Sequence, residues 1–145
     1  MNLQQHVGKV MSVSPSQTGN WLQFTLEHIE KGYAVISLEV RPEMTNPYHN
    51  IHGGMMACVI DESIGWAVVS LESPMNYTTL NLTVDFLYGL KVGERLVAKS
   101  KVVRAGKKIV NVECHVYDLK DNLLAKASSN LVVTGMQRER IEDRE

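Results

Sequence analysis

Residues 48–71 form a long apolar stretch that begins with a histidine and two glycines. After His52-Gly53-Gly54, apolar residues fill most positions up to Leu71, and Asp61 and Glu62 are the only charged residues among them. A helix that is apolar nearly all round has to be buried, because it has no face suited to water. We therefore predict one long buried helix around which the rest of the chain is arranged.

The start of this helix has two features that suit a binding site. Gly53 and Gly54 allow the backbone to come close to another group, since neither carries a side chain. The first N–H groups of a helix also lack partners within the helix. They can therefore receive a carbonyl oxygen or an anion.

Asp61 is the residue of this helix that most needs an explanation. A carboxylate in apolar surroundings is unfavourable unless it is paired, hydrogen-bonded or functional. Ala57, Cys58 and Gly65 lie one helical turn away and are all small, so Asp61 faces a notch. Either a ligand or partner subunit enters this notch, or Asp61 and Glu62 pair with basic groups or cap a neighbouring element.

Composition excludes several other classes of protein. Of the 145 residues, 44% are hydrophobic and 21% charged, which is typical of a soluble globular protein, and the net charge of −1 does not favour nucleic-acid binding. Cys58 and Cys114 have neither metal nor redox spacing, and no signal-peptide core is present, so we expect a cytoplasmic protein. Two adjacent carboxylates at mid-length also argue against a membrane-spanning helix.

Alternating apolar residues predict strands on both sides of the helix. We expect a hairpin from residues 21–29 and 34–40, and then four successive strands over 79–86, 96–102, 109–117 and 123–133. We interpret residues 1–13 as an N-terminal helix, 14–20 as a loop and 137–145 as a charged tail. The whole chain, 1–145, is then one domain.

Short turns between the last strands favour antiparallel pairing in a four-stranded meander. The predicted fold is therefore α+β, with one curved antiparallel sheet wrapped around one long buried helix. Apolar residues also fall on the expected outer face of the sheet, which suggests a dimer or a larger assembly. They are Val97, Val103, Ile109 and Tyr117.

The chain lacks the usual nucleophile elbow, Walker loop and dinucleotide fingerprint. His49 and His52, with Asp61 and Glu62 downstream, could form a metal site, although the histidines lie in a loop and at a helix start without a His-Glu-x-x-His frame. Arg104, Lys107 and Lys108 make a small basic turn that is either a solvated hairpin or a contact for phosphate groups.

Three elements at fixed spacing resemble the PaaI-type (phenylacetate-pathway) hot-dog thioesterases. They are Asn46, the His52-Gly53-Gly54 motif, and Asp61 nine residues after His52. The likeness extends from about residue 35 to residue 133 and includes residues 79–87 and 92–94. It implies a hot-dog fold that is dimeric or tetrameric, with sites at the subunit interface, and hydrolysis of acyl-coenzyme A thioesters without any other cofactor.

The resemblance also implies roles for individual residues. The backbone N–H of Gly53 polarises the thioester carbonyl, and Asp61 of the facing subunit acts as general base or nucleophile. Asn46 positions water or substrate, His52 fixes the loop, and Thr79 helps to hold the nucleophilic water.

Further residues are expected to contact the substrate. Gly54 allows its close approach, and the basic turn meets the coenzyme phosphates. Glu62 is the alternative carboxylate, although the nine-residue interval favours Asp61. Relatives commonly have Arg-Pro where this chain has Tyr88-Gly89, so that arginine contact is absent here.

Three other functions remain open from the sequence. They are a non-catalytic acyl-CoA binding or sensing protein, a hot-dog hydratase or dehydratase, and a metal-binding module built on His49 and His52. The acyl group is not defined, because Met55, Met56, Trp66 and the region of Tyr77 suit either an aliphatic or an aromatic pocket.

Overall fold

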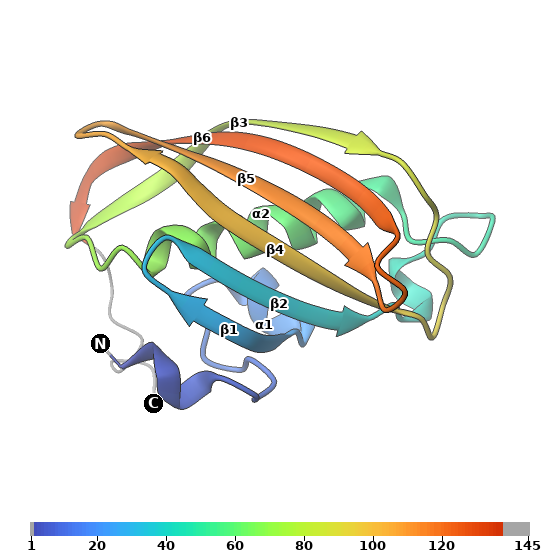
Figure 1. Ribbon diagram of the computed structural model, residues 1–145. Coiled ribbons are helices and arrows are strands. Elements are labelled where there is room, and N and C mark those ends of the chain that lie inside the picture. The colour runs from blue at the N-terminus through green and yellow to red at the C-terminus, as the bar shows by residue number, and fades with distance from the viewer. Residues whose placement is uncertain (1, 138–145) are drawn as a thin grey trace.

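A six-stranded antiparallel sheet curves around one long helix in the computed structural model, which describes residues 2–137 (Figure 1). The helix is α2 (Gly53–Val69). The strands are β1 (Thr25–Glu30), β2 (Tyr33–Glu39), β3 (Met75–Phe86), β4 (Arg95–Ala105), β5 (Ile109–Asp118) and β6 (Leu123–Gln137). The predicted α+β hot-dog architecture is therefore confirmed.

Helix α2 packs one face on the sheet. Its fully buried apolar side chains include Met56, Val59, Ile60, Ile64 and Ala67. They belong to the same core as the inward residues of the strands, among them Ile36, Leu96, Val112 and Leu124. Within this core, the hydroxyls of Ser63 on α2 and Ser100 on β4 lie 2.8 Å apart and satisfy each other. The other face of α2, which includes Asp61, is less completely covered.

The strand order differs from the predicted four-stranded meander. Strands β4, β5 and β6 do form a meander, but β3 pairs with β6, and the sheet order is β1-β2-β4-β5-β6-β3. β3 therefore lies at one edge, and the chain crosses the sheet before β4, which pairs with β2. Local alternation predicts that a segment is a strand, but it does not define the neighbour of that strand.

Strand β3 carries a bulge that changes which side chains face the helix. Its register with β6 shifts between Thr79 and Asn81. An extra residue in one strand moves all later side chains to the opposite face. Thr79 and the later Leu82 therefore face inward together, whereas regular alternation predicts opposite faces, and Leu80 is 58% exposed.

The N-terminal segment also departs from prediction. Residues 17–22 form a short helix, α1 (Gln17–Leu22), where a loop and the start of a strand were expected, and β1 begins only at Thr25. The Ser16 hydroxyl accepts a hydrogen bond from the N–H of Gly19 and so caps α1, and Gln23 ends it in the left-handed conformation. Residues 1–13 contain only the short 3-10 helix η1 (Leu3–His6) rather than a full helix.

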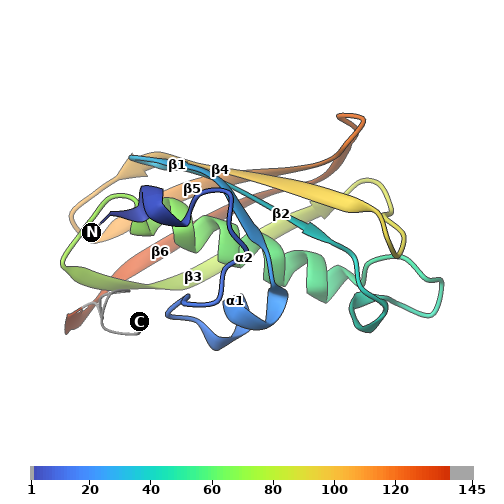
Figure 2. The same cartoon turned by 90° about the horizontal axis from the view of Figure 1, so that it is seen from below.

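The N-terminal segment passes across α2 on the side seen in Figure 2. Its Phe24 ring meets the Trp66 ring of α2 edge-on, with centroids 6.1 Å apart. Arg41 fastens α1 by donating to the carbonyl oxygens of Leu22 and Trp21, at 2.7 and 2.8 Å. The predicted charged tail, apart from Gln137, lies outside the described residues. No helix within residues 2–137 is long and apolar enough to cross a membrane.

Candidate active site

The side chains of Asp61 and Thr79 meet between α2 and β3. The Thr79 hydroxyl donates to Oδ1 of Asp61 over 3.0 Å. The bulge in β3 turns Thr79 toward the helix and makes this contact possible. The two residues are 18 positions apart in the chain, and their contact forms a carboxylate–hydroxyl pair that can hold a water molecule.

Asp61 is exposed to solvent in the single chain. The prediction of a buried carboxylate is therefore wrong for the isolated chain. The sheet covers only one face of α2, and Asp61 lies on the opposite face. The small neighbours Ala57, Cys58 and Gly65 on this face are only partly buried. The predicted notch thus exists but is open to solvent.

His52 caps the start of α2. Its Nδ1 atom accepts a hydrogen bond from the N–H of Gly54 over 2.9 Å, so the neutral ring carries its proton on Nε2. The contact holds the His52 ring at the first turn of the helix, and its expected role in fixing the loop stays a prediction. It also engages the Gly54 N–H within the chain, so the Gly53 N–H is the better candidate for polarising a carbonyl.

Gly53 lies beside the aromatic ring of Phe86 at the end of β3. A Cβ added at Gly53 would lie 3.6 Å from this ring, which is an ordinary contact distance. A Cβ at Gly54 would lie 3.2 Å from Nδ1 of His52, which is tighter. The lack of a side chain at Gly53 thus keeps space open between the helix start and Phe86.

Asn46 organises the loop that leads into α2. Its Oδ1 accepts hydrogen bonds from the N–H groups of Tyr48 and Asn50, at 2.9 and 3.2 Å. The loop follows the 3-10 helix η2 (Pro42–Met44) and includes His49 in the left-handed conformation. Asn46 therefore shapes the approach to the helix start, whereas its expected positioning of water or substrate stays a prediction.

Glu62 has a different environment from Asp61. Its Oε1 accepts from the Ser14 hydroxyl at 3.0 Å and from the Trp66 indole N–H at 3.2 Å. Gly19 of α1 packs so closely that a Cβ there would collide with this carboxyl group. Burial raises the pKa of Glu62 more than these hydrogen bonds lower it.

A pocket of about 250 Å³ adjoins Glu62 between the N-terminal segment, α2 and β3. Its walls include Ser14, Glu62, Gly65, Trp66, Tyr77 and Leu131, and we call it the Glu62 pocket. Trp66 and Tyr77 line it as the sequence suggested, whereas Met56 is buried in the core. Sequence reasoning missed Ser14, because its part in the pocket depends on the unpredicted course of residues 14–22.

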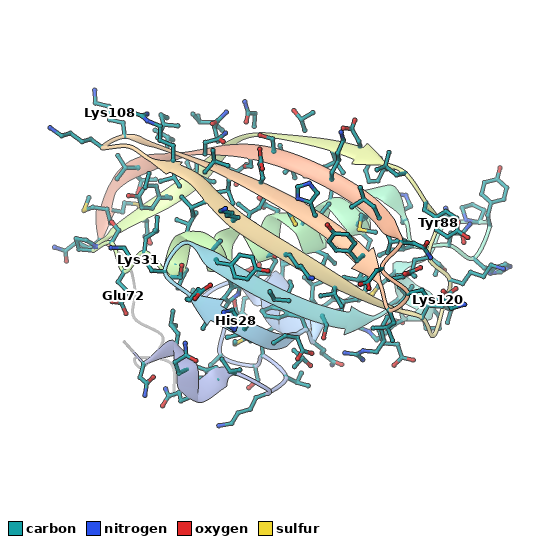
Figure 3. The ribbon with its side chains drawn as sticks, in the orientation of Figure 1. His28, Lys31, Glu72, Tyr88, Lys108 and Lys120 are labelled. Atoms are coloured by element: carbon teal, nitrogen blue, oxygen red, sulfur yellow. The ribbon has the colours of Figure 1, made fainter. Side chains whose placement is uncertain are left out.

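The structure does not bring the basic turn near the start of α2 in the same chain. Arg104, Lys107 and Lys108 are exposed at the β4–β5 hairpin. Figure 3 shows Lys108 at one end of the molecule and Tyr88, which follows β3, at the other. Helix α2 begins near the Tyr88 end (Figure 1).

The histidines do not gather further metal ligands in the part of the chain that the structure describes. No group of three or more His, Cys, Asp or Glu side chains between residues 2 and 137 is placed to hold a metal ion. The metal-binding alternative built on His49 and His52 therefore has no support from the geometry.

The Gly53 backbone and the Asp61 side chain cannot act on the same carbonyl within one chain. They lie eight residues apart on one helix, which corresponds to about 12 Å along the axis. A shared reaction centre therefore needs Gly53 of one copy and Asp61 of another.

Comparison with known proteins identifies the family. The thioesterase superfamily model matches residues 48–125, which contain the helix start, Asp61 and Thr79. The chain belongs to the thioesterase superfamily.

Three similar proteins illustrate this membership. A predicted esterase of Saccharolobus solfataricus is 31% identical over 114 residues, which cover 79% of this chain and 75% of that one. A hypothetical thioesterase of Streptococcus pneumoniae, solved with coenzyme A, is 26% identical with a TM-score of 0.74, covering 80% of this chain and 88% of that one. The Escherichia coli PaaI protein shares the fold, with a TM-score of 0.79 at 20% identity, covering 85% of this chain and 88% of that one.

Proposed function

We propose that this thioesterase-superfamily protein hydrolyses acyl-CoA thioesters at a site shared by two copies of the chain. The observation that carries the proposal is the Thr79–Asp61 hydrogen bond of 3.0 Å, on the open face of α2 and close to a pocket. The coenzyme A bound to the Streptococcus pneumoniae protein supports the class of substrate.

In the proposed reaction, Asp61 and Thr79 hold a water molecule against the thioester carbonyl. The water attacks the carbonyl carbon while Asp61 accepts its proton, the C–S bond breaks, and the coenzyme thiolate takes up the proton. Direct attack by Asp61 followed by hydrolysis is the other route open to the same carboxylate. The N–H of Gly53 from the second copy stabilises the charge that develops on the carbonyl oxygen.

The exposed edge of the sheet supports assembly through β3. β3 is a 12-residue edge strand, and Leu80 and Phe86 on it are 58% and 57% exposed. Long apolar edge strands tend to pair with another chain. A dimer, alone or as half of a tetramer, can pair two β3 strands and bring the open face of α2 in each copy toward the other.

The decisive experiment follows thiol release from a panel of acyl-CoA thioesters with a thiol-reactive dye. Asp61→Asn should lower turnover by about 10²–10⁴-fold, because it removes the base but keeps the side-chain size. Calorimetry should show that the variant still binds acyl-CoA. Asp85→Asn, on the outer face of the same strand as Thr79, is the matched control and should behave like wild type.

Two outcomes would contradict the proposal. Binding of acyl-CoA by wild type without thiol release would identify an acyl-CoA binding protein instead. An active monomer in sedimentation at micromolar concentration would exclude the shared site. Leu80→Arg should weaken assembly and activity together.

A further inference from the structure

The Glu62 pocket is lined by residues that are close neighbours of Asp61 on α2 and of Thr79 on β3. Gly65 lies one helical turn after Asp61 on the same face of α2 and contributes to the pocket. Tyr77 precedes Thr79 by two residues on β3, before the bulge, so both side chains point to the same side. A substrate whose carbonyl carbon lies at Asp61 therefore has the pocket directly beside it.

The size of the pocket limits what it can hold. A volume of about 250 Å³ is many times what one water molecule needs, so the pocket can accept a group of several carbon atoms. This suits an acyl chain of medium length. The side chains of Trp66, Tyr77 and Leu131 provide apolar walls for its methylene groups.

One wall of the pocket is polar and is held in place. Oε1 of Glu62 is fixed by the Ser14 hydroxyl and by the indole N–H of Trp66, which can only donate. Arg41 clamps α1, whose Gly19 packs against the same carboxyl group. The carboxyl group therefore cannot easily move away when a ligand fills the pocket.

A fixed carboxyl group discriminates between acyl chains. A purely aliphatic chain would cover the side of Glu62 that lines the pocket without offering it a hydrogen bond, which is unfavourable. A chain that carries a hydroxyl can donate to Glu62 instead. A site that hydrogen-bonds a substrate hydroxyl discriminates strongly against the analogue that lacks it.

We propose that the Glu62 pocket receives the acyl group and that Glu62 makes it selective for acyl chains that carry a hydroxyl part-way along their length. Glu62 is thus a specificity-determining residue, whereas the chemistry stays with Asp61. This inference rests on the proposed hydrolysis of acyl-CoA.

The test compares three CoA thioesters of equal chain length: octanoyl, 6-hydroxyoctanoyl and 6-aminooctanoyl, in which the polar group lies part-way along the chain. Wild type should show a kcat/KM for the hydroxy substrate about tenfold or more above that for the plain substrate. Glu62→Leu should lower this ratio at least tenfold. Glu62→Gln keeps an acceptor for Ser14 and Trp66, so it should fold, and it should lower the ratio by a smaller factor.

Glu113→Gln, on the outer face of β5, is the matched control and should leave the ratio unchanged. Equal kcat/KM values for the hydroxy and plain substrates in wild type would overturn the inference while leaving the hydrolysis intact. Preference for the amino substrate would overturn it as well, by showing recognition of a cation. If wild type hydrolyses none of the three, the proposed function fails. The dissociation constants of the hydroxy and plain substrates, measured by calorimetry, then test the selectivity of the pocket by itself.

Discussion

The hydroxyl of Thr79 donates to Asp61 across the groove between β3 and α2, over 3.0 Å. The neighbouring carboxyl group of Glu62 is turned by about 100° around the helix and accepts from Ser14 and Trp66. Two adjacent acidic residues thus have separate surroundings. One faces solvent and a hydroxyl group that can position water, and the other forms the wall of a pocket.

Gly53→Ala should fold normally and lose activity. The added methyl group meets the Phe86 ring at 3.6 Å, which the fold can accept, but it occupies space that the substrate carbonyl needs. The loss of turnover should approach the ~10²–10³-fold that removal of one oxyanion donor costs. Gly135→Ala, where a Cβ meets nothing within 4 Å, is the control. Normal kinetics in Gly53→Ala would show that the carbonyl binds elsewhere.

His52→Ala should destabilise the protein by about 1 kcal/mol, which is typical for the loss of a helix N-cap. The alanine cannot accept the hydrogen bond from the Gly54 N–H that Nδ1 now accepts. His52→Asn supplies a new acceptor at the same position and should recover most of the loss. Urea unfolding midpoints of the three proteins measure this effect, and equal midpoints would mean that the cap is not stabilising.

Neutralising Arg104, Lys107 and Lys108 together to Gln should raise KM for acyl-CoA more than it lowers kcat. The basic turn lies far from the α2 start of its own chain, so such an effect indicates that it reaches the coenzyme phosphates in the site of another copy. The effect should shrink at high salt, because exposed charges are screened. A short N-acetylcysteamine thioester lacks these phosphates and should be unaffected, and Lys120→Gln serves as the control.

The stability difference between Glu62→Gln and wild type should depend on pH. Burial raises the pKa of Glu62 in the folded state above its ordinary value of 4.5. The folded protein therefore binds this proton more tightly, and the stability contributed by protonated Glu62 is lost as pH rises through the folded pKa. Urea unfolding at pH 4 and pH 8 should show the variant gaining stability relative to wild type at the higher pH. A constant difference would contradict the raised pKa.

Both cysteines should react slowly with the thiol-reactive dye in the native protein. Burial raises the pKa of Cys114 to about 11, and burial together with the nearby Glu62 and Asp61 carboxylates raises that of Cys58. Little thiolate is then present at pH 8. Glu62→Gln should speed the reaction of Cys58 more than Asp61→Asn does, because Glu62 is the stronger of the two carboxylate influences. Rapid labelling of both thiols in wild type would contradict this.

The sequence alone determined the helix, the strands and the residue types of the candidate site. A long apolar segment opening with His52-Gly53-Gly54 has few ways to fold other than as a buried helix. Alternating residues predict all six strands, and the bounds of β2 and β5 are correct to within one residue. These features depend on local pattern, because side-chain periodicity and capping act over a few residues. The spacing of Asn46, His52 and Asp61 likewise needed no tertiary information.

Which segments meet depends on contacts between distant parts of the chain. The tertiary structure placed β3 at the sheet edge beside β6, and its bulge turned Thr79 toward Asp61. It also sent the N-terminal segment over Glu62 rather than Asp61, which leaves Asp61 exposed where a buried carboxylate was expected. Strand neighbours, bulges and the cover over one helix face depend on contacts between residues far apart in the chain. A short-range sequence pattern does not specify such contacts.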